Sequence, residues 1–120
     1  MLNIRYLPVI LGLFLFSSVH AEEEERWQSP EFVEGAETID LSQAKKLHAE
    51  GVVFVDVRSP RQFNIRHIAG SINLYLKDGL SEASLLKHVK RDQAFVVYCN
   101  GVHCSLSYRS VEQALEWGFG

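Results

Sequence analysis

Two short runs of β-branched and aromatic residues constrain the fold of this 120-residue chain more than any other feature of its sequence. They occupy residues 52–57 and 94–98. Each run is too continuous for a strand with one face in water, and is typical of a parallel strand buried on both faces. Parallel neighbours need crossover connections, which intervening helices supply. The chain is therefore predicted to form an α/β fold with a mainly parallel sheet flanked by helices on both faces.

The crossover helices are predicted from candidate caps, from apolar residues at helical spacing, and from glycine or proline at their ends. Two shorter strands are expected at residues 38–39 and 72–74. The helices are expected between Ser42, a candidate N-cap, and Gly51; from Ser59 and Pro60 to about residue 65; at residues 81–90; and at residues 105–117, before Gly118.

Residues 1–21 are predicted to be a cleaved signal peptide rather than part of the domain. Arg5 precedes an almost wholly apolar stretch at residues 7–16, and small side chains follow at Val19 and Ala21. A retained membrane anchor is the alternative, but a spanning helix needs roughly 20 apolar residues. The mature protein is thus expected to be periplasmic or secreted, with no membrane span after cleavage.

Residues 22–37 are predicted to form an acidic leader segment, and residues 38–120 have the length of one small domain. The whole chain carries a formal net charge of −3, and the loss of Arg5 with the signal peptide makes the mature chain more negative. Because phosphate binding requires a basic face, a nucleic acid is not expected as a partner.

The stretch that points most clearly to chemistry lies where the strand at residues 94–98 runs through a turn into the last predicted helix. Cys99 begins that turn. A sulfur atom at this place would face unpaired backbone N–H groups and the positive end of a helix dipole. Both effects favour a thiolate, so the pKa of Cys99 is expected to be lowered. The same amides would cradle an anionic substrate.

Four parts of the sequence, taken in order, resemble a rhodanese-like domain. They are VDVRSP at residues 55–60, Phe63, HIAGSIN at residues 67–73 and YCNG at residues 98–101. Each part alone is weakly diagnostic, whereas their order and spacing together are fairly specific. The resemblance covers about residues 38–120.

The resemblance implies a sulfurtransferase that works by nucleophilic covalent catalysis. Cys99 matches the family's catalytic position and would take a sulfane sulfur from thiosulfate or a persulfide, hold it as a persulfide, and pass it to a thiol or cyanide. The implied partners are a small sulfur-containing anion or persulfide donor and a thiol acceptor. Neither a metal nor another cofactor is expected. The implied anion cradle is the backbone of Asn100, Gly101, Val102, His103, Cys104 and Ser105.

Two departures from the family pattern accompany the resemblance. Cys104 occupies the sixth position of the loop, where many active members carry an arginine or another polar donor, so a low affinity for thiosulfate is expected. Members also continue past the last predicted helix with another strand and helix, whereas this sequence ends at Gly120. The domain is therefore expected to be C-terminally incomplete, with that strand and helix missing.

The role of the second cysteine stays open on the sequence alone. Cys104 could be a resolving thiol for Cys99, a sulfur relay, or a small residue that fills the loop. The cysteine pair suggests a thiol-disulfide redox protein as one alternative function, and the absent loop arginine suggests a non-catalytic binding module as another. Arg58 is a candidate for electrostatic support of a bound anion, and His103 for support of the thiolate.

Overall fold

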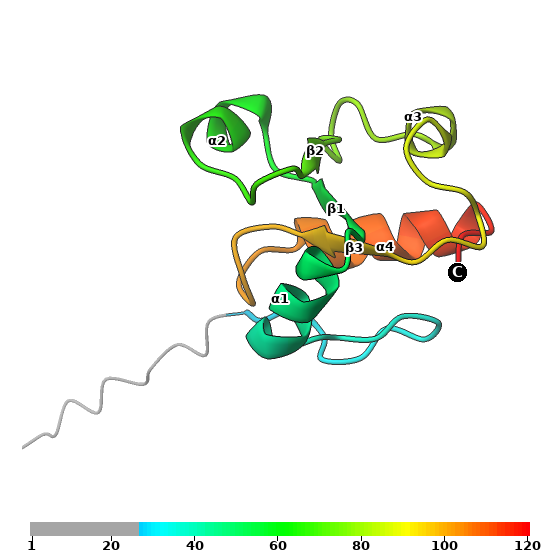
Figure 1. The fold of residues 1–120 in the computed structure, drawn as a ribbon, viewed down its shortest axis with the longest axis horizontal. Coiled ribbons are helices and arrows are strands. Elements are labelled where there is room, and N and C mark those ends of the chain that lie inside the picture. Colours follow the sequence, from blue (N-terminus) through cyan, green and yellow to red (C-terminus); the bar gives the residue numbers. More distant parts are fainter. Residues whose placement is uncertain (1–26) are drawn as a thin grey trace, which may run out of the picture.

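The computed structural model describes residues 27–120 of the chain (Figure 1). The predicted signal peptide and the first part of the leader lie outside the described residues. Across residues 27–120, no helix has the length and apolar character needed to cross a membrane. In chain order the elements are α1 (Leu41–Ala49), β1 (Val53–Asp56), α2 (Pro60–Ile65), β2 (Ile72–Asn73), α3 (Glu82–Leu86), β3 (Phe95–Tyr98) and α4 (Leu106–Glu116).

The three strands form one parallel sheet in the order β2-β1-β3. β1 is the central strand and its last three residues are buried, which confirms the prediction for residues 52–57. β3 pairs with β1 from Phe95 opposite Val53 to Tyr98 opposite Asp56. All four residues of β3 are only half-buried, so the prediction of a second buried strand is wrong. The reason is that β3, within the described residues, has a neighbouring strand on one side only.

Helices cover both faces of the sheet, as predicted. Successive side chains of a strand point to opposite faces. On one face, Val55 and Val57 share a buried cluster with residues of α3 and α4. On the other face, Phe54 makes an edge-to-face contact with His48 of α1, with ring centroids 5.5 Å apart. Thus α1 covers the face opposite to α3 and α4 (Figure 1).

The hydrophobic core lies between the sheet and the α3–α4 side of the molecule. Phe119, after α4, meets Phe95 of β3 edge to face, with ring centroids 6.0 Å apart. Cys99 packs at the border of this core. Packing of α4 against β3 therefore brings the first turn of α4 close to the end of β3. The buried core residues are Val55, Val57, Leu74, Leu85, Val89, Ala114 and Phe119.

The ends of the short elements differ from the predictions in two places. Residues 38–39 form no strand, and the described sheet consists of β1, β2 and β3 alone. The helix predicted at residues 81–90 is limited to α3 and ends at Lys87. Val89 is still buried, four residues after Leu85 and on the same side. The helix predicted after Ser59, α2, is confirmed, with the Ser59 side chain as its cap.

The N-cap of α1 is Asp40 and not the predicted Ser42. The Asp40 Oδ1 accepts a hydrogen bond from the Gln43 N–H at 2.8 Å, and the Gln43 Oε1 accepts one from the Asp40 N–H at 2.9 Å. This reciprocal capping box satisfies two backbone donors at the start of the helix. Ser42 is the second residue of α1, so it lies inside the helix and not at the N-cap position.

Replacing Asp40 with alanine is expected to destabilise the domain by about 1 kcal/mol, because the capping hydrogen bonds are lost. The free energy of unfolding, measured by urea denaturation, tests this. Ser42→Ala is the matched control and should change stability by less than about 0.5 kcal/mol, since Ser42 is exposed on the helix. A larger cost for Ser42→Ala than for Asp40→Ala would place the cap at residue 42 after all.

Candidate active site

Two of the predicted site segments meet where β1 and β3 end. The strands are parallel and Asp56 lies opposite Tyr98, so the residues that follow the two strands emerge side by side. The Val57 N–H continues the pairing by donating to the Tyr98 carbonyl at 3.2 Å. Arg58 therefore lies beside the turn that begins at Cys99. Ligands of parallel sheets commonly bind at this end of the strands.

Arg58 is held in place by a buried carboxylate. Asp56 has no exposed surface, and its Oδ2 accepts a hydrogen bond from the Arg58 Nη2 at 2.7 Å. Its Oδ1 accepts from the Arg58 Nε at 3.0 Å and from the Arg58 backbone N–H at 2.9 Å. Burial alone would raise the pKa of Asp56, but these hydrogen bonds and the guanidinium charge outweigh burial and hold the pKa below its ordinary value. The pair is therefore a stable ion pair at neutral pH.

The guanidinium group of Arg58 also joins this strand end to the loop after β3. Its Nη1 donates to the Asn100 Oδ1 at 3.2 Å, and its Nη2 donates to the Arg66 carbonyl at 2.6 Å. Its Cζ lies 5.8 Å from the centre of the Tyr98 ring, within cation–π range. Arg58 thus lies at the predicted site, but it positions Asn100 rather than pointing at Cys99.

Cys99 lies half-buried at the border of the core, and its thiol donates to the Cys104 carbonyl with a sulfur–oxygen distance of 3.5 Å. The expected lowering of its pKa is wrong. Burial raises the pKa of Cys99, and the hydrogen bond and charge of Cys104 raise it further. The hydroxyl and backbone N–H of Ser107, in the first turn of α4, oppose this by donating to the sulfur. The helix start does face Cys99, but its donors do not outweigh burial.

The backbone donors of the loop converge on Cys104 instead. Burial alone would raise the pKa of Cys104. Hydrogen bonds from the Cys99 thiol and from the Asn100 and Leu106 N–H groups, together with the charge of Arg58, outweigh burial and lower the pKa. The two free cysteines thus form an unequal pair, in which a negative charge is more stable on Cys104 than on Cys99.

The remaining loop residues shape the turn between β3 and α4. Gly101 has a φ of +127°, a left-handed conformation that favours glycine. Its carbonyl accepts a hydrogen bond from the Cys104 N–H at 3.0 Å. Ser105 is the N-cap of α4, although its side chain makes no capping hydrogen bond. Val102 and His103 are exposed.

The leader crosses this loop, a contact that was not predicted from the sequence. The Ser29 Oγ donates to the Cys104 carbonyl at 2.8 Å, and the Ser29 N–H donates to the Val102 carbonyl. The His103 Nδ1 lies 2.9 Å from the Trp27 carbonyl and is therefore engaged by the leader rather than by Cys99. In Figure 1 the loop reaches the start of the described chain.

An aromatic side chain such as Trp27 indicates that the leader could dock on the domain, but no local sequence signal specifies the contact of Ser29 with the loop. Ser29 and Cys104 are 75 residues apart, and a serine in an acidic segment looks like a solvated residue. The Trp27 ring adds to the contact by lying 5.8 Å from the Tyr108 ring of α4, between centroids. Ser29 and Trp27, together with Ser107, therefore join the predicted site residues.

The opposite pKa shifts of the two cysteines predict their order of alkylation. As the pH is raised, iodoacetamide should modify Cys104 with a lower midpoint pH than Cys99, as followed by peptide mass spectrometry. Midpoints are compared rather than rates, so that unequal exposure of the two sulfurs does not decide the result. In a Cys99→Ala variant the midpoint of Cys104 should move to higher pH, because the Cys99 thiol donor is lost. Reaction of Cys99 at the lower pH would contradict the pKa order.

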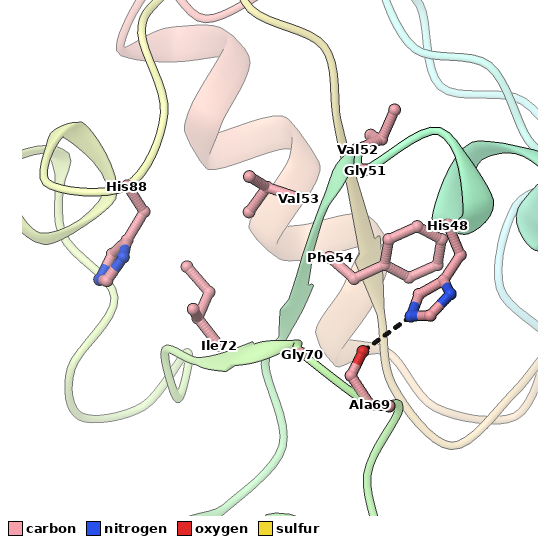
Figure 2. Close-up of a pocket in the computed structure, with 9 residues that line it drawn as sticks. All are labelled: His48, Gly51, Val52, Val53, Phe54, Ala69, Gly70, Ile72 and His88. Carbon is pink, nitrogen blue, oxygen red and sulfur yellow. Dashed lines mark hydrogen bonds between the residues drawn. The ribbon is translucent and has the colours of Figure 1, made fainter.

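The other histidines lie away from the loop. His67 stacks on Phe63 with ring centroids 3.7 Å apart and contacts the Phe63 carbonyl, which orders the turn after α2. Figure 2 shows His48 and His88 at a cavity of about 300 Å³ beside the start of β1, at the opposite end of that strand from Arg58. Within residues 27–120, no three side chains of His, Cys, Asp or Glu gather as metal ligands would.

Comparison with known proteins gives a consistent result. The model of the Rhodanese-like domain matches residues 40–119. The "Thiosulfate sulfurtransferase GlpE" of Pseudomonas syringae pv. syringae (strain B728a) is 39% identical over 61 residues, which are 51% of this chain and 55% of the relative. The protein of the same name from Ectopseudomonas mendocina (strain ymp) is 36% identical over 61 residues, 51% of this chain and 53% of that relative. The chain thus spans about half the length of these curated relatives. No solved structure matches it.

Proposed function

The chain belongs to the rhodanese-like domain family, and from this we propose that it is a sulfurtransferase in which Cys99 carries a sulfane sulfur as a persulfide. The donor would be thiosulfate or another persulfide, and the acceptor a thiol or cyanide. The names of two partly matching relatives, both thiosulfate sulfurtransferases, support thiosulfate as the donor.

The observation that carries the proposal is the position of Cys99. It follows a parallel strand directly, lies half-buried at the strand's carboxyl end, and receives donors from Ser107 in the first turn of α4. A nucleophile placed there has one protected side and one side open to the loop. Such a site lets an anion approach the sulfur along the loop amides.

The sulfur-loading step begins with loss of the Cys99 proton. The neighbouring Cys104 thiolate is the base that accepts this proton, and the Cys99 thiolate that results is the more basic and more nucleophilic of the two. The Cys99 sulfur attacks the sulfane sulfur of thiosulfate, a new sulfur–sulfur bond forms, and sulfite leaves with the electron pair of the bond that breaks. The products are a Cys99 persulfide anion, a Cys104 thiol and sulfite, with charge conserved.

The charge of the donor and of the persulfide would be held by the loop backbone. Within the described residues, the N–H groups of Gly101, Val102, His103 and Ser105 donate to no backbone carbonyl. Amides that are already fixed in place stabilise an anion without reorganising during the reaction. Arg58 supports this arrangement indirectly, because it holds the side chain of Asn100 at the start of the loop.

Incubation of the reduced protein with thiosulfate tests the proposal. The expected result is a gain of one sulfur atom per chain by intact mass, release of one sulfite, and location of the extra sulfur on the Cys99 peptide. Cyanide should then remove the sulfur as thiocyanate. A protein that stays folded by circular dichroism but gains no sulfur from thiosulfate or from glutathione persulfide would contradict the proposed function.

We also propose that residues 1–21 direct export, on the strength of the apolar stretch at residues 7–16 and the small residues before Glu22. The full-length chain expressed in a bacterial host should then be recovered from the periplasmic fraction, with Glu22 as its first residue. Recovery of the uncleaved chain from the cytoplasm would exclude export.

A further inference from the structure

Cys104 is close enough to react with a sulfur atom carried on Cys99. The Cys99 Sγ is 3.5 Å from the Cys104 carbonyl oxygen. Since bonds of about 1.2 and 1.5 Å separate that oxygen from the Cys104 Cα, the Cys99 Sγ lies within about 6 Å of that Cα. A disulfide requires the two Cβ atoms to lie about 3.8 Å apart. Formation of the bond therefore requires the Cys104 side chain and the loop to close further toward the Cys99 Sγ.

A hydrogen bond from the leader helps to hold Cys104 close to Cys99. The Ser29 Oγ donates to the same Cys104 carbonyl oxygen that accepts from the Cys99 thiol. The left-handed turn at Gly101 directs the chain back, so that Cys104 faces the start of the loop. Both cysteines are half-buried, which limits the access of external thiols to either sulfur. The first thiol that a sulfur on Cys99 meets is thus Cys104.

We propose that Cys104 discharges the Cys99 persulfide within the same molecule, with release of hydrosulfide and formation of a Cys99–Cys104 disulfide. This inference rests on the proposed function, because it begins from the loaded Cys99, and it names the immediate thiol acceptor. The protein would then act as a reductase of sulfane sulfur rather than only as a carrier of it.

The discharge step balances without an external oxidant. The Cys104 sulfur attacks the inner sulfur, the Cys99 Sγ, and a Cys99–Cys104 bond forms. The bond between the Cys99 Sγ and the outer sulfur breaks, and the outer sulfur leaves with the bonding electrons and with the Cys104 proton as hydrosulfide. The two cysteines are oxidised and the sulfane sulfur is reduced. A dithiol, either a small molecule or a protein, then reduces the disulfide and returns both thiols for the next cycle.

The electrostatics of the loop favour Cys104 in this role. The Asn100 and Leu106 N–H groups and the Arg58 charge lower its pKa despite burial, which favours the attacking thiolate. After loading, the outer sulfur of the persulfide and the Cys104 sulfur share one negative charge and one proton between them. Transfer of that proton to the outer sulfur makes it a better leaving group.

The fate of the loaded sulfur after donor removal tests the inference. Wild-type protein is loaded anaerobically with thiosulfate, freed of donor by gel filtration, and followed by intact mass and by a colorimetric assay for hydrosulfide. The expected course is first-order loss of the added sulfur, release of one hydrosulfide per chain, and a final mass two hydrogen atoms below that of the reduced protein. Cys104→Ser and Cys104→Ala should hold the added sulfur at least about tenfold longer, because a neighbouring thiol acts at a high effective concentration.

A variant with its second cysteine at a position away from the loop provides the matched control. Lys87 is exposed and directly follows α3. In Figure 1, α3 lies on the opposite side of the molecule from the loop between β3 and α4. A Lys87→Cys/Cys104→Ser variant has the wild-type number of cysteines, and it should hold the sulfur as long as Cys104→Ser does. Restoration of fast loss by Lys87→Cys would show attack between molecules and overturn the inference.

The outcomes also separate the inference from the proposed function. Loading of sulfur on Cys99 followed by equally slow loss from wild-type protein and both Cys104 variants would overturn the inference and leave the sulfurtransferase intact. Failure of folded wild-type protein and of both Cys104 variants to gain sulfur from any sulfane donor, with no hydrosulfide released, would overturn both. The two Cys104 variants guard against a single substitution that disturbs the loop.

Discussion

Replacing Cys99 with serine is expected to lower the rate of sulfur transfer from thiosulfate to cyanide by on the order of 10³-fold or more. The serine hydroxyl has nearly the same size and still donates to the Cys104 carbonyl, so the loop should keep its shape. It cannot, however, form the persulfide on which the transfer depends. Steady-state formation of thiocyanate, with sulfite measured in parallel, provides the rate.

Cys104→Ser is the matched substitution at the other member of the pair. It removes the neighbour whose hydrogen bond and charge contribute to the raised pKa of Cys99. In wild-type protein, the loading rate should therefore rise with pH beyond the ordinary thiol pKa of about 8.5, as the Cys99 thiolate forms. In Cys104→Ser this rise should move to lower pH. Loss of sulfur loading in Cys104→Ser and its retention in Cys99→Ser would instead identify Cys104 as the nucleophile.

Replacing Arg58 with methionine is expected to destabilise the domain by about 3–5 kcal/mol at neutral pH. Methionine preserves the apolar stem of the side chain but leaves the fully buried Asp56 carboxylate without its guanidinium partner. A buried charge that loses its ion-pair partner keeps its desolvation cost and loses the compensating attraction. Urea denaturation at pH 7 provides the free energy of unfolding.

Arg61→Met is the matched control for the loss of a positive charge, because Arg61 is exposed on α2. It should change stability by less than about 0.5 kcal/mol. A cost below about 1 kcal/mol for Arg58→Met would mean that solvent or a rearranged neighbour takes over the role of the guanidinium group.

The pH dependence of stability gives the Asp56 pair an independent signature. In wild-type protein the pKa of Asp56 is lower in the folded state than in the unfolded state. The contribution of the ionised Asp56 to the free energy of unfolding is therefore complete above the unfolded aspartate pKa of about 3.9, and it is lost as the pH falls through the lower folded pKa. In Arg58→Met the sign reverses, because unopposed burial raises the pKa and the folded state binds more protons. The cost of Arg58→Met should therefore shrink as the pH falls from 7 toward 4.

The fold could be predicted from local patterns because several of them agree. The run at residues 52–57 contains β-branched and aromatic residues that fit only a strand, and it became the buried β1. Ser59 and Pro60 specify the start of α2 through a side-chain cap and a fixed φ, which need no tertiary partner. Cys99 could likewise be placed between a strand and a helix, since a strand, a glycine turn and an amphipathic helix follow directly along the chain.

Elements without strong local signals were predicted less well. Asp40 and Ser42 are both good caps, and the choice between them depended on Gln43 closing the capping box with Asp40. Residues 38–39 have strand-forming side chains but pair with none of the three strands of the described sheet. The half-burial of β3 depends on how many neighbours the strand has, which no short window of sequence contains.

The sequence by itself determined the order of elements, the family and the position of the two cysteines, because these follow from residues that are neighbours along the chain. Only the tertiary structure decided which thiol is the more acidic. That property depends on how far each sulfur is buried and on which N–H groups and charges face it, and the groups come from α4, the loop and Arg58. The contact of Ser29 with the loop was likewise set by folding, since it joins segments 75 residues apart.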